Sequence, residues 1–530
     1  MVRGPGERRG FGHRGRTAPD GDRRDRNELR PIVSRPSAPF SGAPAQEPPV
    51  SKTGGAGLAS APDAGDIGYS KDLKARHINM IAIGGAIGTG LFLGAGGRLA
   101  QAGPALALAY AVCGLFAFFV VRALGEMVMH RPSSGSFVSY AREFLGEKGS
   151  YVAGWMYVVN WSTTGIADIT AIALYTHYWS LFSDIPQWLM ALVALAVVLA
   201  INLISVKIFG ELEFWFAIIK VAAMVLFMCI GIFLIATRHP VGEGTPGLGM
   251  ITDNGGFFPE GVVPVVLVMQ GVIFAYASVE LVGVTAGETA EPHKVVPKAV
   301  NAIMWRVGVF YVGSVVLLAL LLPWSAYNDG ESPFVTVLSN IGVPAAGDVM
   351  NLVVLTAAAS SLNSGLYSTG RILRSMAMSG SAPGFTGRMN KSKVPYGGIL
   401  LTCAVCVLGV GLNYVVPGKA FEIVLNISAL GVMSTWCMVM LCHMVFVRRT
   451  REGLLRRPSF RLPWSPYTEI VTIVFLLCLM GLMWNDTAIG RPTLMMVPVL
   501  AVLLTGGWFL VRGRVDRIAR ARAEGQHPVE

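Results

Sequence analysis

Three ionisable side chains lie inside long apolar stretches of this sequence and are its first candidates for chemistry. Lys220 lies within Phe216–Val221, Asp168 within Gly165–Ala171 and Glu280 within Val272–Gly283. Taking a charge out of water costs several kcal/mol unless a partner compensates for it, so such residues are paired or functional. A desolvated lysine can also exchange a proton near neutral pH, which makes Lys220 a candidate for proton transfer.

A glycine-rich stretch in the first long apolar segment is the second candidate. Residues 83–91 read IGGAIGTGL, with four glycines within seven positions. Because glycine weakens a helix interior, this density favours a helix that is broken here, with its free backbone N–H groups available to an anion. Close helix packing through the small residues Gly84 and Gly88 is the alternative interpretation.

The composition places these residues in a membrane. The mean hydropathy is +0.55 and only 14% of the residues are charged, against about 25% in soluble domains. The net charge of +11 gathers in the tails and in particular loops, so it does not indicate nucleic-acid binding. All seven cysteines lie in apolar segments, which argues against an extracellular disulfide framework. Residues 1–70, rich in Arg, Pro, Gly and Ser, are predicted to be a disordered cytoplasmic tail.

Apolar windows of membrane-spanning length recur along the rest of the chain. We predict twelve transmembrane helices, at residues 78–102, 105–130, 151–182, 186–206, 209–236, 262–288, 300–323, 347–376, 397–415, 420–447, 467–485 and 492–511. Lys and Arg gather in the loops after the second, eighth and tenth segments and are absent from those after the third and seventh. The positive-inside rule then predicts that both termini are cytoplasmic.

The sixth predicted segment contains an interruption that parallels the first. Residues 272–283 read VIFAYASVELVG, so small residues and a carboxylate break an otherwise smooth apolar helix. This segment lies five helices after the first and enters the membrane from the opposite side. Discontinuous helices at such positions are what an inverted five-helix repeat predicts, and transporters place substrate sites between them.

The same stretches resemble the amino acid permeases of the amino acid–polyamine–organocation superfamily. The resemblance covers about residues 68–513 and includes GGAIGTGLF at 84–92, RALGEM at 122–127, PSSGSF at 132–137, GELEFW at 210–215 and AGET at 286–289. Within that family, YAREF at 140–144, GIADITA at 165–171 and SSLNSGLYSTGR at 360–371 are most similar to the bacterial permeases for L-asparagine.

The resemblance implies an all-α polytopic membrane protein with a five-plus-five inverted-repeat (LeuT-like) core. It also implies uptake of an amino acid, most similar in type to L-asparagine, by proton symport with alternating access. GABA, proline, D-serine, D-alanine or glycine are the alternative substrates, and a non-transporting amino acid receptor is a further alternative. The domain prediction is a cytoplasmic tail at 1–70, the ten-helix core at 71–447, two peripheral helices at 448–513 and a cytoplasmic tail at 514–530.

An amino acid substrate presents a carboxylate and an ammonium, and both need partners once they leave water. We expect the carboxylate to meet the N–H groups of the first break, at Ile87, Gly88, Thr89 and Gly90. The Thr89 hydroxyl either adds a bond or bonds back to its own helix. The resemblance assigns the ammonium to carbonyl groups of both breaks, at Ile83, Gly84, Phe274 and Ala275.

The remaining candidates have more than one possible role. Tyr276 and Ser278 are expected to line the site, and Glu280 faces the ammonium, gates the inner side or caps unwound backbone. Asp168 selects the substrate's side chain, through a carboxamide, or pairs with a lysine. Lys220 matches the lysine implicated in proton coupling in the family, or acts as a fixed cation at the first break. Glu126, near the inner end of the second segment, anchors the cytoplasmic gate or the adjacent basic loop.

These features together predict a multi-pass protein of the bacterial cell membrane. Its expected partners are an amino acid, a coupling proton and the lipid bilayer. We expect no cofactor, no metal and no nucleic acid, and the sequence does not predict an oligomeric state. The sequence contains no H-x-x-x-H or G-x-S-x-G arrangement, and its eight histidines are scattered, so we do not expect an enzyme. A channel is disfavoured because no ring of like charges accompanies the breaks.

Overall fold

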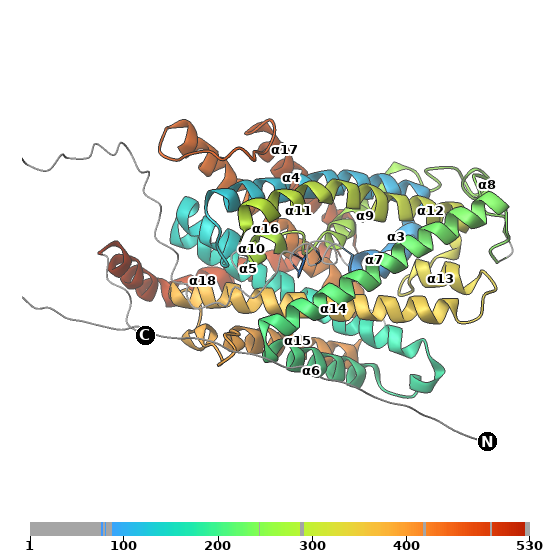
Figure 1. Cartoon of the computed structure of the whole chain (residues 1–530), viewed down its shortest axis with the longest axis horizontal. Coiled ribbons are helices and arrows are strands. Elements are labelled where there is room, and N and C mark those ends of the chain that lie inside the picture. Colours follow the sequence, from blue (N-terminus) through green and yellow to red (C-terminus); the bar gives the residue numbers. More distant parts are fainter. Residues whose placement is uncertain are drawn as a thin grey trace, which may run out of the picture. The chain divides into compact units, whose positions relative to one another are not determined.

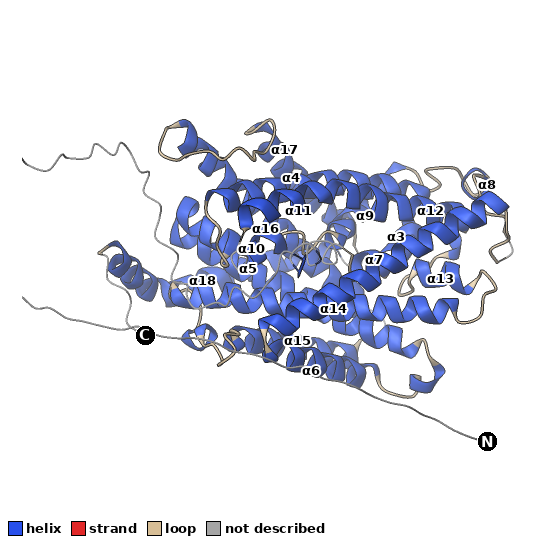
Figure 2. Ribbon diagram, viewed as in Figure 1, coloured by secondary structure: helices blue, strands red, loops and turns tan. Residues whose placement is uncertain are grey.

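The structure, a computed structural model, describes residues 76–77, 80, 87–242, 244–286, 291–416, 420–487 and 490–524, all of which belong to the compact unit Gly57–Glu530. Within these ranges the chain is helical, and the one β-type contact is an isolated bridge between Val241 and Gly244 (Figure 2). The predicted tail at 1–70 lies outside the described residues.

The longer helices follow the predicted apolar segments closely. In chain order they are α3 (Gly94–Ala102), α4 (Leu106–His130), α5 (Ser136–His177), α6 (Gln187–Ile204), α7 (Val206–Thr237), α9 (Val262–Ala275), α11 (Pro292–Arg306), α12 (Ser314–Leu321), α14 (Ala346–Met378), α15 (Tyr396–Val415), α16 (Ala420–Arg451), α17 (Tyr467–Leu482) and α18 (Gly490–Ala523). The short helices are α2 (Thr89–Phe92), α8 (Gly249–Thr252), α10 (Leu281–Ala286) and α13 (Pro333–Ser339), and six further short turns connect them.

Nine helical runs in the described ranges are long and apolar enough to cross a membrane. They are Gly94–His130, Gln187–Ile204, Val206–Thr237, Pro292–Leu321, Ala346–Met378, Tyr396–Val415, Ala420–Arg451, Tyr467–Asn485 and Gly490–Ala523. The prediction of an all-α, multi-pass membrane protein is confirmed. Two further helices are not among these nine runs: α5, which contains residues 151–177 of the predicted third segment, and the shorter α9.

The helix α5 is central to the packing. It makes its most extensive contacts with α14 and α16, and it also packs on α6 and α15. Figure 1 shows α6 and α15 along one edge of the bundle, α4 and α11 toward the opposite edge, and α17 beyond α4. Large side chains such as Trp161, Tyr157 and Trp436 are fully buried between these helices, so α5 presents a wide buried face to its neighbours.

Three helices differ from their predicted extents. The helix α5 begins at Ser136, because the loop expected before residue 151 is itself helical, with non-helical backbone at Gly146 (φ +81°). The segment predicted as one helix at 300–323 contains a π-helical stretch, η4 (Val307–Gly313), between α11 and α12. The helix α18 continues past residue 513 to Ala523, into the predicted C-terminal tail.

A helix begins inside the first predicted break, and the sixth predicted segment is interrupted. The helix α2 begins at Thr89 with Gly88 as its N-cap, and α3 follows after Leu93. The helix α9 ends at Ala275, residues 276–280 form turns, and α10 resumes at Leu281. Ser278 within this second interruption adopts a left-handed conformation with φ +81°, which is uncommon for a residue other than glycine.

Candidate functional site

The backbone at the start of α2 lies against the backbone at the end of α9. A Cβ atom added at Gly90 would lie 2.5 Å from Ala275 Cα and 3.0 Å from the Phe274 ring, so only glycine allows this approach. The Tyr311 hydroxyl donates to the Ala275 carbonyl at 2.9 Å and fixes the end of α9. The first turn of α2 therefore packs against the end of α9, where the sixth predicted segment is interrupted.

Asp168 connects the first break to α5. The Thr89 hydroxyl donates to Asp168 Oδ1 at 2.8 Å rather than to its own helix, and both side chains are buried. Asp168 Oδ2 makes no hydrogen bond of acceptable geometry within the described residues, although Ser361 lies beside it. Because a half-paired buried carboxylate is costly, Oδ2 is an acceptor that a ligand or a proton would stabilise.

Lys220 belongs to a buried chain of polar groups that runs from α7 to α14. Its Nζ donates to Ser360 Oγ at 2.9 Å, and Ser360 in turn donates to Glu213 Oε1. Asn363 lies 3.5 Å from the other oxygen of Glu213 and accepts from Asn202 at 2.9 Å. Lys220 is 1% exposed and Glu213 fully buried, so the two charges compensate each other through one hydroxyl.

Lys220 is also electrostatically coupled to Asp168. It therefore lies between two carboxylates, Asp168 at the first break and Glu213 on its own helix. This arrangement joins the first break to a buried cation and to a second acid. Transfer of a proton along it would change the charge next to Thr89.

Glu280 lies at the second interruption and is almost completely buried, with 1% of its surface exposed. Neither carboxylate oxygen makes a hydrogen bond of acceptable geometry within the described ranges. The indole of Trp161 and the ring of Tyr157 lie beside it, and the Trp161 Nε1 atom is likewise unpaired in the described part of the chain. A buried acid in this state is a strong candidate to meet a cation.

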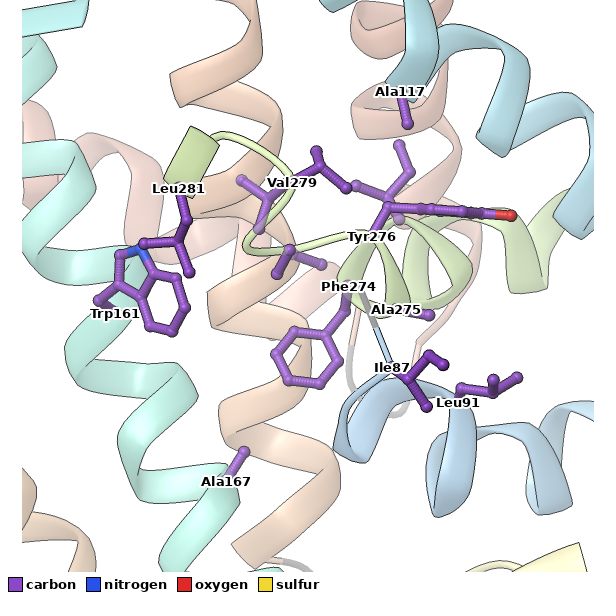
Figure 3. Packing of buried hydrophobic residues seen from close by; sticks show 14 of the residues in the cluster. Ile87, Leu91, Ala117, Trp161, Ala167, Phe274, Ala275, Tyr276, Val279 and Leu281 are labelled. Carbon is purple, nitrogen blue, oxygen red and sulfur yellow. The ribbon is translucent and has the colours of Figure 1, made fainter. Parts of the chain in front are cut away.

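Trp161 and Asp168 define the extent of the site along α5. They are seven residues apart, which places them on one helix face about 10 Å from each other at 1.5 Å per residue. Figure 3 shows the Phe274 ring between the levels of Trp161 and Ala167, on the side that faces α5. The Glu280 carboxylate and Asp168 Oδ2, neither with a hydrogen-bond partner among the described residues, thus lie toward opposite ends of a span that a small amino acid could bridge.

The other predicted site residues lie as follows. Ile83 and Gly84 lie outside the described residues. Ile87 is buried, and Gly88 is partly exposed with nothing within 4 Å of an added Cβ atom. Tyr276 is oriented away from Trp161 in Figure 3, and its hydroxyl donates to the Tyr110 carbonyl at 2.7 Å.

Ser278 is 91% buried, since 9% of its surface is exposed, and its hydroxyl donates to the neighbouring Ala277 carbonyl. Its left-handed backbone turns the chain between α9 and α10. The side chain is therefore engaged locally, next to the unpaired Glu280.

Glu126 lies in a separate cluster and does not join the other candidates. Arg457 Nε donates to Glu126 Oε1 at 2.6 Å, and the Leu462 backbone N–H donates to Oε2 at 2.6 Å. His443 lies 3.1 Å from Glu126 and 2.8 Å from Glu469. Glu126 thus contacts the basic segment that follows α16, and not the basic loop next to its own helix; its part in the cytoplasmic gate stays a prediction.

Sequence reasoning did not single out Glu213. The signal that could have found it is its spacing, since Glu213 and Lys220 are seven residues apart and therefore share one face of α7 after two turns. Its neighbour Glu211 differs, because that side chain is 34% exposed and pairs with Arg76. The helical periodicity of α7 thus distinguishes the buried Glu213 from the partly exposed Glu211.

Comparison with known proteins identifies the family. The profile of the amino acid permeases, described as "Amino acid permease", matches residues 77–520. The chain belongs to the amino acid permease family. It is a multi-pass membrane protein of a family of amino acid transporters.

Individual relatives of this permease are similar over most of their length. A protein of Streptomyces coelicolor named L-asparagine permease is 79% identical over 86% of this chain and 93% of its own. Proteins with the same name from Salmonella typhimurium and Escherichia coli are each 58% identical over 86% of this chain, and over 92% and 91% of their own.

Proposed function

We propose that this permease imports L-asparagine by proton symport. The observation that carries the proposal is the packing of the start of α2 on the end of α9, beside two buried carboxylates, Asp168 and Glu280, that lack full hydrogen bonding in the described residues. Such a site suits a small molecule that carries both a positively charged group and further hydrogen-bond donors. The names of the similar proteins support asparagine as that molecule.

The substrate's two charges bind at the two breaks in this proposal. Its carboxylate accepts from the N–H groups of Ile87, Gly88, Thr89 and Gly90, where α2 begins. Its ammonium binds carbonyl groups at Ile83, Gly84, Phe274 and Ala275, together with the Glu280 carboxylate. Tyr276 and Ser278 shape the second break, and neither needs to touch the ligand to do so.

The side chain of asparagine is recognised by Asp168. A carboxamide NH₂ donates two hydrogen bonds, and Asp168 Oδ2 is an acceptor without a partner of acceptable geometry in the described residues. Substrates that lack this donor leave Oδ2 unsatisfied, which costs free energy in a buried site. This difference favours asparagine over proline or GABA.

Proton coupling is assigned to Lys220 with Glu213. A proton on Lys220 balances Asp168 and Glu213, and its loss leaves the two acids uncompensated. The occupied and empty sites therefore prefer different protonation states, which links the proton to the substrate. The hydroxyl of Ser360 is the path between Lys220 and Glu213.

Twelve transmembrane helices in a five-plus-five inverted-repeat (LeuT-like) core complete the proposal. The core comprises residues 71–447, and α17 and α18 supply the two peripheral helices at 448–513. Both termini, including the tails at 1–70 and 514–530, are cytoplasmic, as the basic loops indicate. The interrupted helices rock against α5 and α14, and Glu126 steadies the inner end of α4.

The test is uptake of radiolabelled L-asparagine into proteoliposomes under an inward proton gradient, with unlabelled amino acids as competitors. Gradient-driven accumulation that asparagine blocks best supports the proposal. Better competition by GABA, proline or D-serine changes the substrate but keeps the mechanism. Binding without gradient-driven uptake of any amino acid overturns symport and favours an amino acid receptor.

A further inference from the structure

The segment that joins α16 to α17 is strongly basic. Residues 448–467, which we call the basic connection, contain six arginines and a single acid, Glu452. Figure 1 shows this segment as a loop at the edge of the bundle beside α17. Three of its arginines are exposed and pair with no acid in the part of the chain that the structure describes, namely Arg451, Arg456 and Arg461. The basic connection therefore presents an excess of positive charge at the surface.

Two of these three arginines are held in place by backbone carbonyls. Arg451 Nη2 donates to the Ser465 carbonyl at 3.0 Å, and Arg461 Nε donates to the Pro458 carbonyl at 2.9 Å. A guanidinium has five N–H donors, so each of the two keeps several for a further acceptor. Because a positioned guanidinium binds phosphate through parallel hydrogen bonds, the pair is suited to a phosphate group.

Large apolar side chains are exposed between the arginines. Leu454 is 68% exposed, Trp464 77% and Tyr467 73%. Trp464 also has a left-handed backbone with φ +54°, which is uncommon for a bulky residue, while Leu462 two positions earlier is buried. The fold itself thus directs the indole outward. Arginines and exposed aromatic side chains on one segment match an amphiphile with an anionic head.

The basic connection lies at the level of the membrane surface. One membrane-spanning run, Ala420–Arg451, ends where it begins, and the next, Tyr467–Asn485, begins where it ends. Trp and Tyr are enriched at this level because their rings suit the boundary between lipid and water. A soluble acidic protein would match the arginines, but only a lipid also matches the apolar side chains at the boundary.

The basic connection is also bound to two helices of the candidate transport core. The Leu462 backbone N–H donates to Glu126 of α4 at 2.6 Å. Arg122 of α4 donates from Nε to the Arg461 carbonyl at 2.9 Å and from Nη1 to Asn301 of α11 at 2.6 Å. The helix α4 in turn packs on both α9 and α11. A ligand that holds the basic connection therefore also holds the inner ends of α4 and α11.

We propose that the basic connection is a binding site for an anionic phospholipid of the leaflet predicted to be cytoplasmic. Arg451, Arg456 and Arg461 bind its phosphate, and Trp464 and Tyr467 lie beside its glycerol and the first part of its acyl chains. The bound lipid stabilises the permease through the contacts to α4 and α11. This site is separate from the one for the amino acid and does not depend on which amino acid is transported.

The test is titration of the purified full-length protein in detergent with phosphatidylglycerol, with bound lipid counted by native mass spectrometry. Phosphatidylcholine with the same acyl chains is the reference lipid, and the wild type should bind phosphatidylglycerol more tightly. Three simultaneous substitutions should weaken the binding of phosphatidylglycerol roughly a hundredfold, or about 1 kcal/mol for each arginine. They are Arg451→Gln, Arg456→Gln and Arg461→Gln.

The loop after α14 supplies a control with the same change of charge. Its three exposed cations lie on the same predicted side of the membrane and can be removed together by Arg388→Gln, Lys391→Gln and Lys393→Gln. This second triple variant should bind phosphatidylglycerol as the wild type does.

Two further measurements cover the case in which the first triple variant does not fold. Arg456→Gln alone changes an exposed side chain and should weaken the binding of phosphatidylglycerol about fivefold. In nanodiscs of phosphatidylcholine, a minor fraction of brominated phosphatidylglycerol should quench a part of the tryptophan fluorescence that Trp464→Phe lacks. The same fraction of brominated phosphatidylcholine should quench that part less.

The outcomes decide between a lipid site and a general effect of charge. Equal binding of the two lipids by the wild type, or equal quenching of Trp464 by both brominated lipids, overturns the proposal. The arginines would then serve membrane orientation or a soluble acidic partner. An equal loss in both triple variants also overturns it, because net charge and not a site would be responsible. None of these measurements uses asparagine, so their failure and the failure of the proposed function are independent.

Discussion

Lys220 reaches a buried acid through a single hydroxyl, and this short chain is the most specific feature of the molecule at the scale of residues. Glu213, Ser360 and Lys220 are all buried, so no water screens the interaction. Removal of one member of a buried charge pair is costly, because the other charge loses its compensation. The cation and the acid should therefore act as a unit.

Lys220→Ala should abolish gradient-driven accumulation of asparagine while part of the substrate exchange persists, since exchange needs no net proton movement. The measurement compares uptake under a proton gradient with counterflow in proteoliposomes. The control is Lys207→Ala, which removes an exposed lysine from the same helix. Full pH-dependent accumulation by Lys220→Ala would exclude its coupling role.

Glu213→Gln should also uncouple uptake from the proton gradient, because Glu213 lies at the other end of the hydrogen-bond chain that starts at Lys220. The amide keeps the size of the side chain and can still accept from Ser360, but it can neither take up a proton nor balance Lys220. We expect uptake to lose its dependence on the gradient. Glu211→Gln is the matched control, two residues away and at the surface, and should retain gradient-driven uptake. Equal behaviour of the two variants would contradict the assignment.

Glu280→Gln tests the ammonium contact. A hydrogen bond to a charged group is worth about 1.5–3 kcal/mol. We therefore expect KM for asparagine to rise roughly tenfold to a hundredfold, at the rate of about 1.4 kcal/mol per factor of ten. The maximal rate of uptake and the surface amount of protein serve as controls for folding. An unchanged KM would leave Glu280 as a structural residue of the second break.

At the scale of elements, the contact between α2 and α9 depends on a single missing side chain. Gly90→Ala would place a methyl group 2.5 Å from Ala275 Cα, where backbone and not a flexible side chain must move. Overpacking of this kind costs about 1–3 kcal/mol. Thermal unfolding of the purified protein should show a lower midpoint, whereas Gly88→Ala, which meets nothing within 4 Å, should not. Equal midpoints would mean that the two breaks do not pack tightly.

The sequence predicts elements better than it predicts contacts. Glycine density and a lone carboxylate located the breaks near Thr89 and Glu280, because local composition decides where a helix stops. The partner of Thr89 was left open, since Asp168 is 79 residues away and only tertiary packing brings it within 2.8 Å. The π-helical stretch Val307–Gly313 contains Gly308 and Gly313, but two separated glycines in an apolar segment do not predict a π-helix, and it was missed.

Two charged residues were missed although a signal existed. Glu213 shares a helix face with Lys220, and Arg98 is a cation in the outer half of the first apolar segment. The burial of these two residues was not predicted, because a charged residue near the end of a membrane-spanning segment is usually solvated. Their burial depends on glycines and hydroxyls from other helices, namely Gly271 beside Arg98 and Ser360 beside Glu213.

At the scale of the whole molecule, one buried cluster ties the peripheral helix α17 to the rest of the permease. Glu126 of α4, His443 of α16 and Glu469 of α17 lie in a row, and the two contacts of His443 measure 3.1 and 2.8 Å. Arg457 and the Leu462 backbone N–H extend the row into the segment after α16. Two helices and one connection therefore meet at the Glu126 carboxylate, and His443 links them to α17.

Glu126→Ala should loosen this junction as a whole. The change leaves Arg457 and the Leu462 N–H without their acceptor and removes one of the two carboxylates beside His443, and loss of one partner of a buried ion pair costs about 3–5 kcal/mol. The permease should unfold at a lower temperature, as measured by size-exclusion chromatography after heating. Glu452→Ala removes an acid from the exposed Arg448 pair near the same end of α16, and solvent already screens that pair. If the two variants unfold at the same temperature, the Glu126 carboxylate has no role in joining α4 to α16 and to the segment that follows it.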